Sequence, residues 1–379
     1  MTEWTQCFLG DVLKLQRGHD LPDRLRRDGP VPVVSSSGIT GWHNEAKAKA
    51  PGVVTGRYGT LGEVYFIEDD YWPLNTSLYV VDFKGNQPRF ISYFLRSVLK
   101  NYKSDKAAVP GIDRNVAHCL PVKRPDPDTQ RRIVSILSAY DDLIENNRRR
   151  IALLEQAARE IYREWFVRLR FPGHEHVKVV DGVPEGWLKM SLTKAADNVD
   201  YGYTASASSD NIGPRFLRIT DIVGGPINWG SVPFCEMPDR KLARFLLDPA
   251  DIVVARTGAT TGWARRIGRM NEKSVFASYL VRFRFGERIR PLLASVYMES
   301  ELYKAQIAAR LGGAAQPNAS AVVLGAPEIL IPTHQIQHDF MEVAEPITEQ
   351  VDILVNQSET LAKARDLLLP RLMNGSILV

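Results

Sequence analysis

Apolar side chains recur at alternating steps of four and three residues between Ile133 and Trp165, and Asn147 fills the one polar position of the series. A repeat sustained over more than four heptads predicts one long helix with an apolar stripe along which a second helix packs. The positions that we assign to this stripe are Ile133, Leu137, Tyr140, Ile144, Asn147, Leu154 and Ile161.

A second series near the end of the chain repeats every seven residues. Its members lie 207 residues after members of the first series and are Phe340, Ile347, Leu354, Leu361 and Leu368. Pro346 interrupts this second helix or marks the start of its regular part, because proline is tolerated mainly in a first turn. Either series alone fits an ordinary amphipathic core helix as well as it fits a helix of a coiled-coil pair. Their shared register favours an antiparallel pair, with Asn147 fixing the register.

The segments before the two helices repeat as well. Three residues have a counterpart 207 positions later, namely Pro110 at Pro317, Pro125 at Pro332 and Gln130 at Gln337. Residues 52–66 resemble residues 251–267 at an offset of 199, so the second half carries insertions. Matched positions in the same order of elements indicate an internal duplication.

Short runs of β-branched and aromatic residues between Gly, Pro, Asn and Asp clusters predict strands in each half. We therefore expect an α/β (α+β) fold. Two similar domains of mixed α/β or mostly β structure would be separated and joined by two long antiparallel helices. The expected boundaries are 1–125 for the first domain, 126–171 for the first long helix, 172–183 for a linker, 184–332 for the second domain and 333–375 for the second long helix.

Composition narrows the class of protein. The chain of 379 residues is 44% hydrophobic and 24% charged, as soluble globular proteins are, and it has no apolar run of membrane-spanning length. Its start resembles no signal peptide, so we expect a cytoplasmic protein. The three cysteines, Cys7, Cys119 and Cys235, match no metal or disulfide spacing.

Charge is unevenly distributed along the chain. Residues 1–125 carry 17 Lys and Arg against 13 Asp and Glu, and residues 184–333 carry 18 against 14. Residues 334–379 carry 3 against 7. The two domains are thus slightly basic, which permits a polyanionic partner without requiring one.

The sequence offers little catalytic chemistry. It contains no phosphate-binding loop with lysine, no dinucleotide motif and no zinc-protease motif. His334 and His338 have helical spacing but lack a third ligand, and we read them as surface residues. Asp23, Glu45 and Lys47 loosely match a metal-dependent nuclease, a pattern that most charged proteins of this length contain. We predict no catalytic residue and no metal site.

Each half has an arginine at a strand end followed by glycines. Arg57 precedes Tyr58, Gly59 and Gly62, and Arg256 precedes Thr257, Gly258 and Gly262. Glycines allow a sharp turn and close approach, backbone N–H groups can donate to phosphate, and arginine can bind guanine through two bonds. One such loop alone is more simply a tight hairpin; its repetition favours DNA binding. Further candidate DNA contacts are Trp42, His43, Asn44, Lys47 and Lys49 in a polar loop, and Gln316 and Asn318 beside Pro317.

The order domain–helix–domain–helix resembles the specificity subunit of type I restriction-modification systems. The likeness extends over essentially the whole chain and includes the glycine loops, the Pro-to-Gln passages at 125–130 and 332–337, and the sequence EWFVRLRFPG at 164–173. The domains match only in outline. The first glycine loop is one residue shorter than the second, and Pro346 departs from the helical repeat.

This resemblance implies a protein that recognises DNA and is not itself catalytic. Each domain would read one half of a bipartite, asymmetric site in double-stranded DNA. The helical pair would set the spacer and dock two modification (methyltransferase) subunits. S-adenosylmethionine would belong to those partners, ATP and Mg to partner restriction subunits, and no cofactor to this chain. The alternatives are a stand-alone metal-dependent nuclease and a helical scaffold that does not bind DNA.

Overall fold

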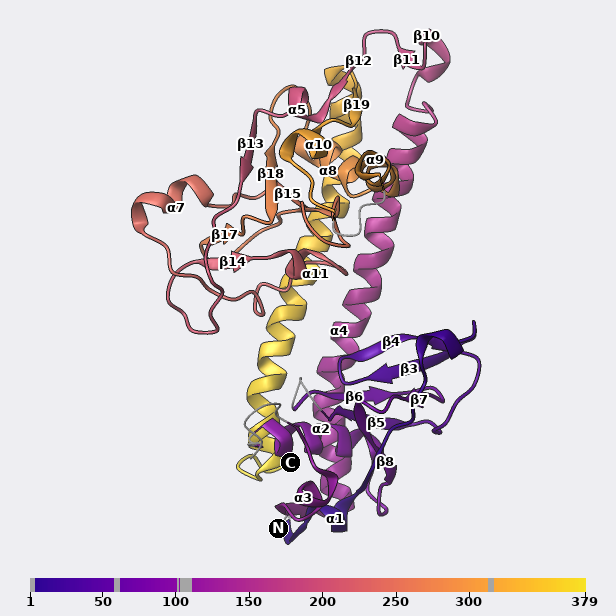
Figure 1. Cartoon of the computed structure of the whole chain (residues 1–379), viewed down its shortest axis with the longest axis vertical. Helices are drawn as coiled ribbons and strands as arrows, with labels where there is room; N and C mark the ends of the chain where they lie inside the picture. The colour runs from indigo at the N-terminus through magenta and orange to yellow at the C-terminus, as the bar shows by residue number, and fades with distance from the viewer. Residues whose placement is uncertain (1–3, 58–61, 101, 103–110, 313–316) are drawn as a thin grey trace. The chain divides into compact units, whose positions relative to one another are not determined.

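The computed structural model describes residues 4–57, 62–100, 102, 111–312 and 317–379. The chain forms two compact units: residues 1–144 with 360–379 make the first unit, and residues 145–359 make the second. Two long helices, α4 (Pro127–Tyr162) and α11 (His334–Met373), contribute residues to both units (Figure 1).

The first unit is built on a four-stranded antiparallel sheet of order β2-β8-β5-β6. Helix α2 packs on this sheet. Strands β4, β3 and β7 form a separate, smaller sheet in that order. Strands β1 and β9 pair antiparallel next to the short helices α1 and α3. The bounds of these elements are β1 Trp4–Phe8, α1 Leu9–Val12, β2 Lys14–Arg17, η1 Asp23–Leu25, β3 Val31–Ser35, β4 Gly38–His43, β5 Gly52–Gly56, β6 Val64–Ile67, β7 Trp72–Pro73, β8 Ser77–Asp82, α2 Pro88–Lys100, α3 Arg114–His118 and β9 Pro121–Pro125.

The second unit repeats this topology. Its main sheet has the order β13-β18-β15-β16, its strands β14 and β17 are parallel as β3 and β7 are, and β12 pairs with β19 as β1 pairs with β9. The bounds are β10 Val179–Val180, β11 Val183–Pro184, β12 Leu188–Ser191, α5 Leu192–Ala195, β13 Asn198–Tyr201, β14 Arg215–Leu217, α6 Ile219–Ile222, α7 Asp239–Phe245, β15 Ile252–Ala255, β16 Ala264–Arg266, β17 Ser274–Phe276, β18 Leu280–Arg284, α8 Pro291–Met298, α9 Glu301–Leu311, α10 Ala321–Gly325 and β19 Glu328–Ile331.

Two buried glutamines show the duplication at the level of single bonds. The side-chain amide of Gln130 donates to the Pro125 carbonyl at 3.1 Å, and that of Gln337 donates to the Pro332 carbonyl at 3.0 Å. Each side-chain oxygen accepts a backbone N–H from the loop before α2 or α8, at 3.3 Å and 2.9 Å. Each glutamine therefore ties a strand end, a helix start and a loop together. The predicted fold and its internal repeat are confirmed.

Helix α11 runs through Pro346, so the prediction that this proline interrupts the helix or starts its regular part was wrong. A proline removes one N–H and leaves the carbonyl four residues earlier without its helical partner. Pro346 and Glu342 are both exposed, so water can bind that carbonyl. A π-helical turn, η2 (Arg163–Val167), follows α4, and the 3₁₀ turn η3 (His174–His176) precedes β10.

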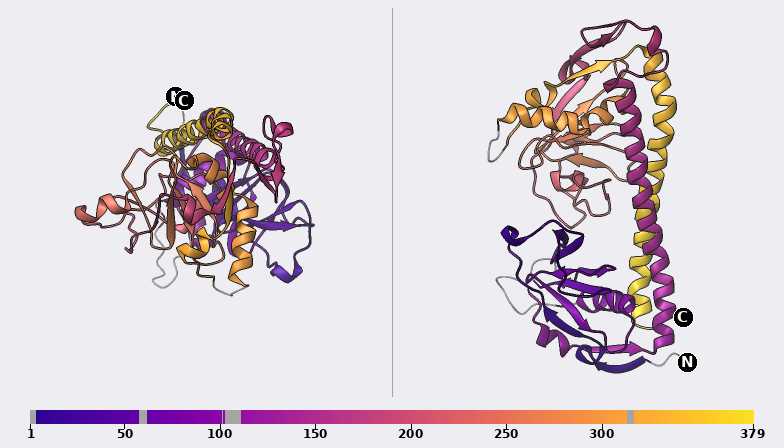
Figure 2. Two further views of the ribbon diagram at one scale, coloured as in Figure 1. Left: turned by 90° about the horizontal axis from the view of Figure 1, so that it is seen from above. Right: turned by 90° about the vertical axis from the view of Figure 1, so that its right-hand side faces the viewer.

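The long helices pack in antiparallel order within each unit (Figure 2). Ile133 and Leu137 of α4 share a core with Leu369 and Leu372 of α11 in the first unit. In the second unit the later turns of α4 pack with the earlier turns of α11, and Asn147 Nδ2 donates to Ser358 Oγ at 3.3 Å. Five of the twelve predicted packing positions are buried and seven are half-buried.

The described part of the chain holds no helix that combines the length and apolar character needed to cross a membrane.

Candidate nucleic-acid interface

Arg57 and Arg256 occupy the same backbone setting in their respective units. The N–H of Arg57 donates to the Thr76 carbonyl at 3.0 Å, and its carbonyl accepts from Ile112 N at 2.9 Å. The N–H of Arg256 donates to the Tyr279 carbonyl at 3.0 Å, and its carbonyl accepts from Ala319 N at 2.8 Å. The fold therefore delivers one arginine to the end of β5 and one to the end of β15 by matching bonds.

The side chain of Arg256 is held in place by its neighbours. Nη2 donates to Asn318 Oδ1 at 3.0 Å, and Nε donates to the Ala319 carbonyl at 3.3 Å. The guanidinium carbon lies 4.9 Å from the centre of the Tyr201 ring. Thr257 forms a β-bridge with Asn318. Two segments that the sequence predicted independently as DNA contacts therefore lie next to each other. An ordered guanidinium loses less conformational entropy when it binds a ligand.

The glycines of these loops have backbone angles that explain their residue type. Gly62, Gly258 and Gly262 have φ values of 89°, 78° and 91°, in the left-handed region. A Cβ on Gly262 would lie 3.1 Å from Ile307 Cγ2, whereas Gly258 is exposed with nothing within 4 Å. Gly262 thus allows the loop to pack on α9, and Gly258 leaves an open approach to the backbone.

The segment predicted as a polar loop begins inside a strand, because Trp42 and His43 end β4 and pair with β3, so the loop prediction was wrong for these two residues. Trp42 is 55% exposed, and exposed Lys47 places Nζ 5.1 Å from the centre of the Trp72 ring. His43 is only 5% exposed, because its Nδ1 accepts from Arg27 N at 3.1 Å and its ring lies edge-on to Trp72. Trp42 and Lys47 can meet a ligand directly, whereas His43 packs inside the unit at the end of β4. Its DNA contact stays a prediction, and burial disfavours it.

Tyr58, Gly59 and Gln316 lie outside the described residues. Asn44 is exposed, and Lys49 forms an ion pair with Asp70 at 2.6 Å.

Helix α7 carries candidate phosphate contacts that the sequence reasoning missed. Its cations Arg240, Lys241 and Arg244 are exposed, and among the described residues no carboxylate forms an ion pair with them. Lys241 Nζ lies 5.3 Å from the centre of the Tyr203 ring. The spacing of these cations along DRKLARF was the available signal, but charge was counted only over whole domains.

These cations connect with Arg256 through two tyrosines. Tyr203 follows Tyr201 by two residues in the chain. Lys241 lies over the Tyr203 ring, and Arg256 lies over the Tyr201 ring. We call this set the basic–aromatic strip: Arg240, Lys241, Arg244, Tyr203, Tyr201, Arg256 and Asn318. Arginine and lysine bind phosphate oxygens, and arginine and asparagine also bind base edges.

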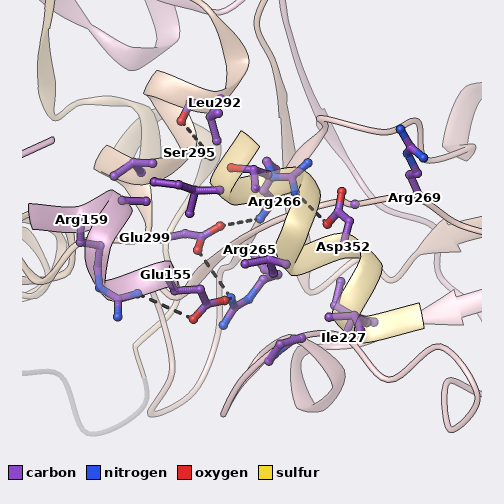
Figure 3. Close-up of a pocket in the computed structure, with 18 of the residues that line it drawn as sticks. Glu155, Arg159, Ile227, Arg265, Arg266, Arg269, Leu292, Ser295, Glu299 and Asp352 are labelled. Carbon is purple, nitrogen blue, oxygen red and sulfur yellow. Dashed lines mark hydrogen bonds and ion pairs between the residues drawn. The ribbon is translucent and has the colours of Figure 1, made fainter. Parts of the chain in front are cut away.

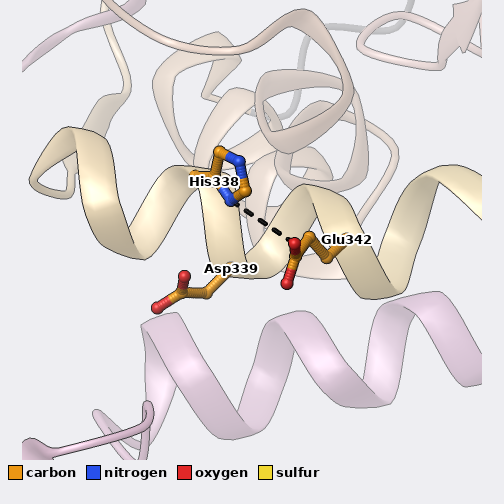
Figure 4. A group of neighbouring side chains, drawn as sticks. All are labelled: His338, Asp339 and Glu342. Carbon is orange, nitrogen blue, oxygen red and sulfur yellow. Dashed lines mark ion pairs between the residues drawn. The ribbon is translucent and has the colours of Figure 1, made fainter.

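The described residues show one close group of three potential metal ligands, formed by His338, Asp339 and Glu342 on α11 (Figure 4). His338 Nδ1 lies 3.9 Å from Glu342 Oε1, and Asp339 accepts from Gln335 Nε2 at 2.7 Å. Helical spacing alone explains this exposed cluster. Asp23 forms an ion pair with Arg26 at 3.0 Å, and neither Asp23 nor Glu45 belongs to this group of three.

Known proteins share this architecture. Residues 1–156 match the family described as the type I restriction modification DNA specificity domain. The specificity subunit of the type I restriction enzyme MjaVIII from Methanocaldococcus jannaschii is 24% identical over 76% of this chain and 70% of its own length. The MjaIX specificity subunit of the same organism is 24% identical over 73% and 65%.

One solved structure resembles the fold of the whole chain. The crystal structure of the type I restriction-modification S subunit from M. genitalium aligns over 98% of this chain and 96% of its own, with a TM-score of 0.55 and 14% identity. The family match covers residues 1–156, and residues 145–359 repeat the strand order of the first unit. The chain is thus similar to specificity subunits of type I restriction-modification systems: its first 156 residues match their DNA specificity domain, and the whole chain shares the fold of one such subunit.

Proposed function

We propose that this chain is the DNA-recognition subunit of a type I restriction-modification complex, in which each unit reads one half of a bipartite, asymmetric site. The observation that carries the proposal is the repeated arginine. Arg57 and Arg256 are held by matching backbone bonds in two units of the same topology. A duplicated fold that presents one arginine per copy is suited to two separate half-sites.

The second unit has groups for both kinds of DNA contact. The guanidinium of Arg256 and the amide of Asn318 can bind base edges in the major groove. The exposed cations of α7 suit the phosphate backbone, which fixes position and orientation without reading sequence. The basic–aromatic strip therefore combines sequence reading with non-specific affinity.

Partners supply the chemistry in this proposal. The long helices set the spacer between half-sites and dock two modification (methyltransferase) subunits, which bind S-adenosylmethionine. Restriction (motor-nuclease) subunits bind ATP and Mg. This chain contributes recognition and assembly and holds no cofactor of its own. Residues 133–162, the part of this series that lies in α4, extend about 44 Å along the helix axis, compared with about 34–36 Å for half-sites one DNA turn apart.

Methylome sequencing tests the proposal. Cells that carry this chain and its modification partner should methylate one split motif with a fixed spacer, and cells that carry the partner alone should not. Methylation without a split motif would overturn the proposal.

The two alternatives predict other outcomes. A nuclease would cleave DNA with magnesium as the purified chain alone and lose that activity in Glu45→Ala. A scaffold that does not bind DNA would leave its complex unable to retain duplex DNA at low salt.

A further inference from the structure

Two neighbouring arginines of β16 connect the strands of the second unit to both long helices (Figure 3). We call the part of each unit outside the long helices its recognition domain. Arg265 Nη1 lies 3.2 Å from Glu155 Oε1 on α4. Arg266 Nη2 lies 3.0 Å from Asp352 Oδ1 on α11. Successive residues of a strand point to opposite sides, so one short strand can bind two different helices.

Glu299, just after α8, joins the two arginines. Its Oε2 lies 3.5 Å from Arg265 Nη1, and its Oε1 accepts the N–H of Arg266 at 2.7 Å. None of these side chains is among the DNA contacts proposed above. We call the five residues Glu155, Arg265, Arg266, Glu299 and Asp352 the polar joint.

The polar joint is shielded from solvent. The side chains of Arg265 and Arg266 are 14% and 17% exposed, and those of Glu155 and Asp352 are 25% and 19% exposed. They line a cavity of about 110 Å³. A Cβ on Gly268, two residues after β16, would lie 2.7 Å from Asp352 Oδ1, so a larger residue there would displace this carboxylate. Ion pairs shielded in this way are weakened less by salt than surface pairs.

The domain has a separate apolar attachment further along the helices. Phe340 of α11 is fully buried, and its ring centre lies 5.0 Å from that of Phe166. Trp187 joins the same core and packs on Phe166. Asp352 follows Phe340 by 12 residues, which corresponds to about 18 Å along the helix axis. A body attached at two points this far apart cannot pivot about either one.

The first unit has a comparable joint made from different residues. Tyr93 of α2 donates through its hydroxyl to Asp141 Oδ2 of α4 at 2.5 Å, and Arg365 of α11 donates to Asp141 Oδ1 at 2.6 Å. Arg89 adds an ion pair to Asp142 at 3.3 Å. Both units therefore connect a recognition domain to both helices through a polar group, although the side chains differ.

We propose that Arg265 and Arg266, through Glu155 and Asp352, are positioning residues that set the angle of the second recognition domain on the helices and so the half-site spacing that the chain accepts. The inference rests on the proposed function. The joint touches no base; it acts by directing Arg256 and the basic–aromatic strip. Loss of the joint should therefore broaden spacer tolerance without changing which bases are preferred.

A spacer panel tests this inference with the full chain and its modification partner. Duplexes would keep both half-sites and carry the natural spacer, or one base pair more or fewer. We expect Arg266→Asp to reduce the preference for the natural spacer by about tenfold, and Asp352→Arg to do the same. The double variant Arg266→Asp with Asp352→Arg restores the ion pair with reversed charge and should recover the preference.

Arg269→Gln is the matched control. Arg269 lines the same cavity and is exposed, and Figure 3 draws no bond from it to the other labelled side chains. This variant should keep the wild-type spacer preference. Arg266→Met, which removes the charge but keeps most of the volume, repeats the test with less disturbance of folding.

The outcomes separate this inference from the proposed function. Folded Arg266 variants that bind the site with unchanged spacer preference would overturn the positioning role and leave the proposed function standing. A wild-type complex that shows no preference for any split site would overturn the proposed function itself. Failure of the charge-reversed pair to recover the preference, with both single variants impaired, would also contradict the role assigned to this contact.

Discussion

In the second unit, Arg256 Nη2 donates a hydrogen bond to Asn318 Oδ1 at 3.0 Å, across 62 residues of sequence. The bond fixes the guanidinium beside an exposed amide, so the two side chains form one recognition element. The order of this pair depends on the β-bridge between Thr257 and Asn318.

Asn318→Ala should therefore impair recognition of one half-site only. The variant loses its own contact and the order of Arg256, and we expect about 1–3 kcal/mol weaker binding to the second half-site. Competition binding with duplexes altered in one half-site at a time measures this. An equal loss on duplexes altered in either half would contradict it.

Removal of two α7 cations, Lys241→Gln with Arg244→Gln, should weaken binding to all DNA sequences alike. Each lost phosphate contact should lower the slope of log affinity against log salt by about 0.9. Affinity measured across a salt series gives that slope. The control is Lys178→Gln with Lys189→Gln, which removes the same charge from exposed positions outside the strip. A slope that falls equally in the control would assign the effect to net charge alone.

His118 should make the stability of the first unit dependent on pH. Its Nε2 accepts the Leu15 N–H at 2.9 Å, which requires the neutral ring. Burial, with Arg114 and Lys14 nearby, lowers the pKa of His118 below its usual 6.5. The stabilisation is present above pH 6.5 and is lost as the pH falls through the lowered folded-state value.

Thermal unfolding between pH 7.5 and pH 5 measures that dependence. The wild-type chain should lose more Tm over this interval than His118→Gln, whose side chain does not titrate. Parallel curves for the two proteins would show that another group controls the acid sensitivity.

Phe340→Ala should destabilise the second unit by about 3–5 kcal/mol, because it opens a cavity in a fully buried aromatic cluster. Leu367→Ala on the same helix is the comparison, since Leu367 is 72% exposed. Denaturant unfolding gives both values. Similar costs for the two variants would mean that the cluster does not hold the helices together.

The long helices were predictable because their packing leaves a periodic trace in the sequence. Ile133 and Phe340 are fully buried members of series that sequence spacing alone identified. The repeat was visible at Gln130 and Gln337 because a buried amide that satisfies both a backbone N–H and a backbone carbonyl has few substitutes. Strand order was not predictable, since it depends on pairings between distant segments.

The interface was only partly predictable. The turn at Gly258 follows from local backbone chemistry, but the contact of Arg256 with Asn318 and Tyr201 is made by tertiary folding. His43 looked like a surface residue in a polar loop, yet the approach of Trp72 buries it. Pro346 was misjudged because local propensity takes no account of an exposed helix face where water can bind the freed carbonyl.

The proposal that each unit reads its own half-site is tested most directly by equilibrium binding. Arg57→Ala and Arg256→Ala are each measured on duplexes in which one half-site at a time is scrambled. Each variant should become indifferent to scrambling of one half-site, a different one for each arginine, and keep full discrimination at the other, with losses of about 1–3 kcal/mol. Equal weakening of both variants on every duplex, scrambled or not, would show that the arginines bind phosphate alone and would contradict the account.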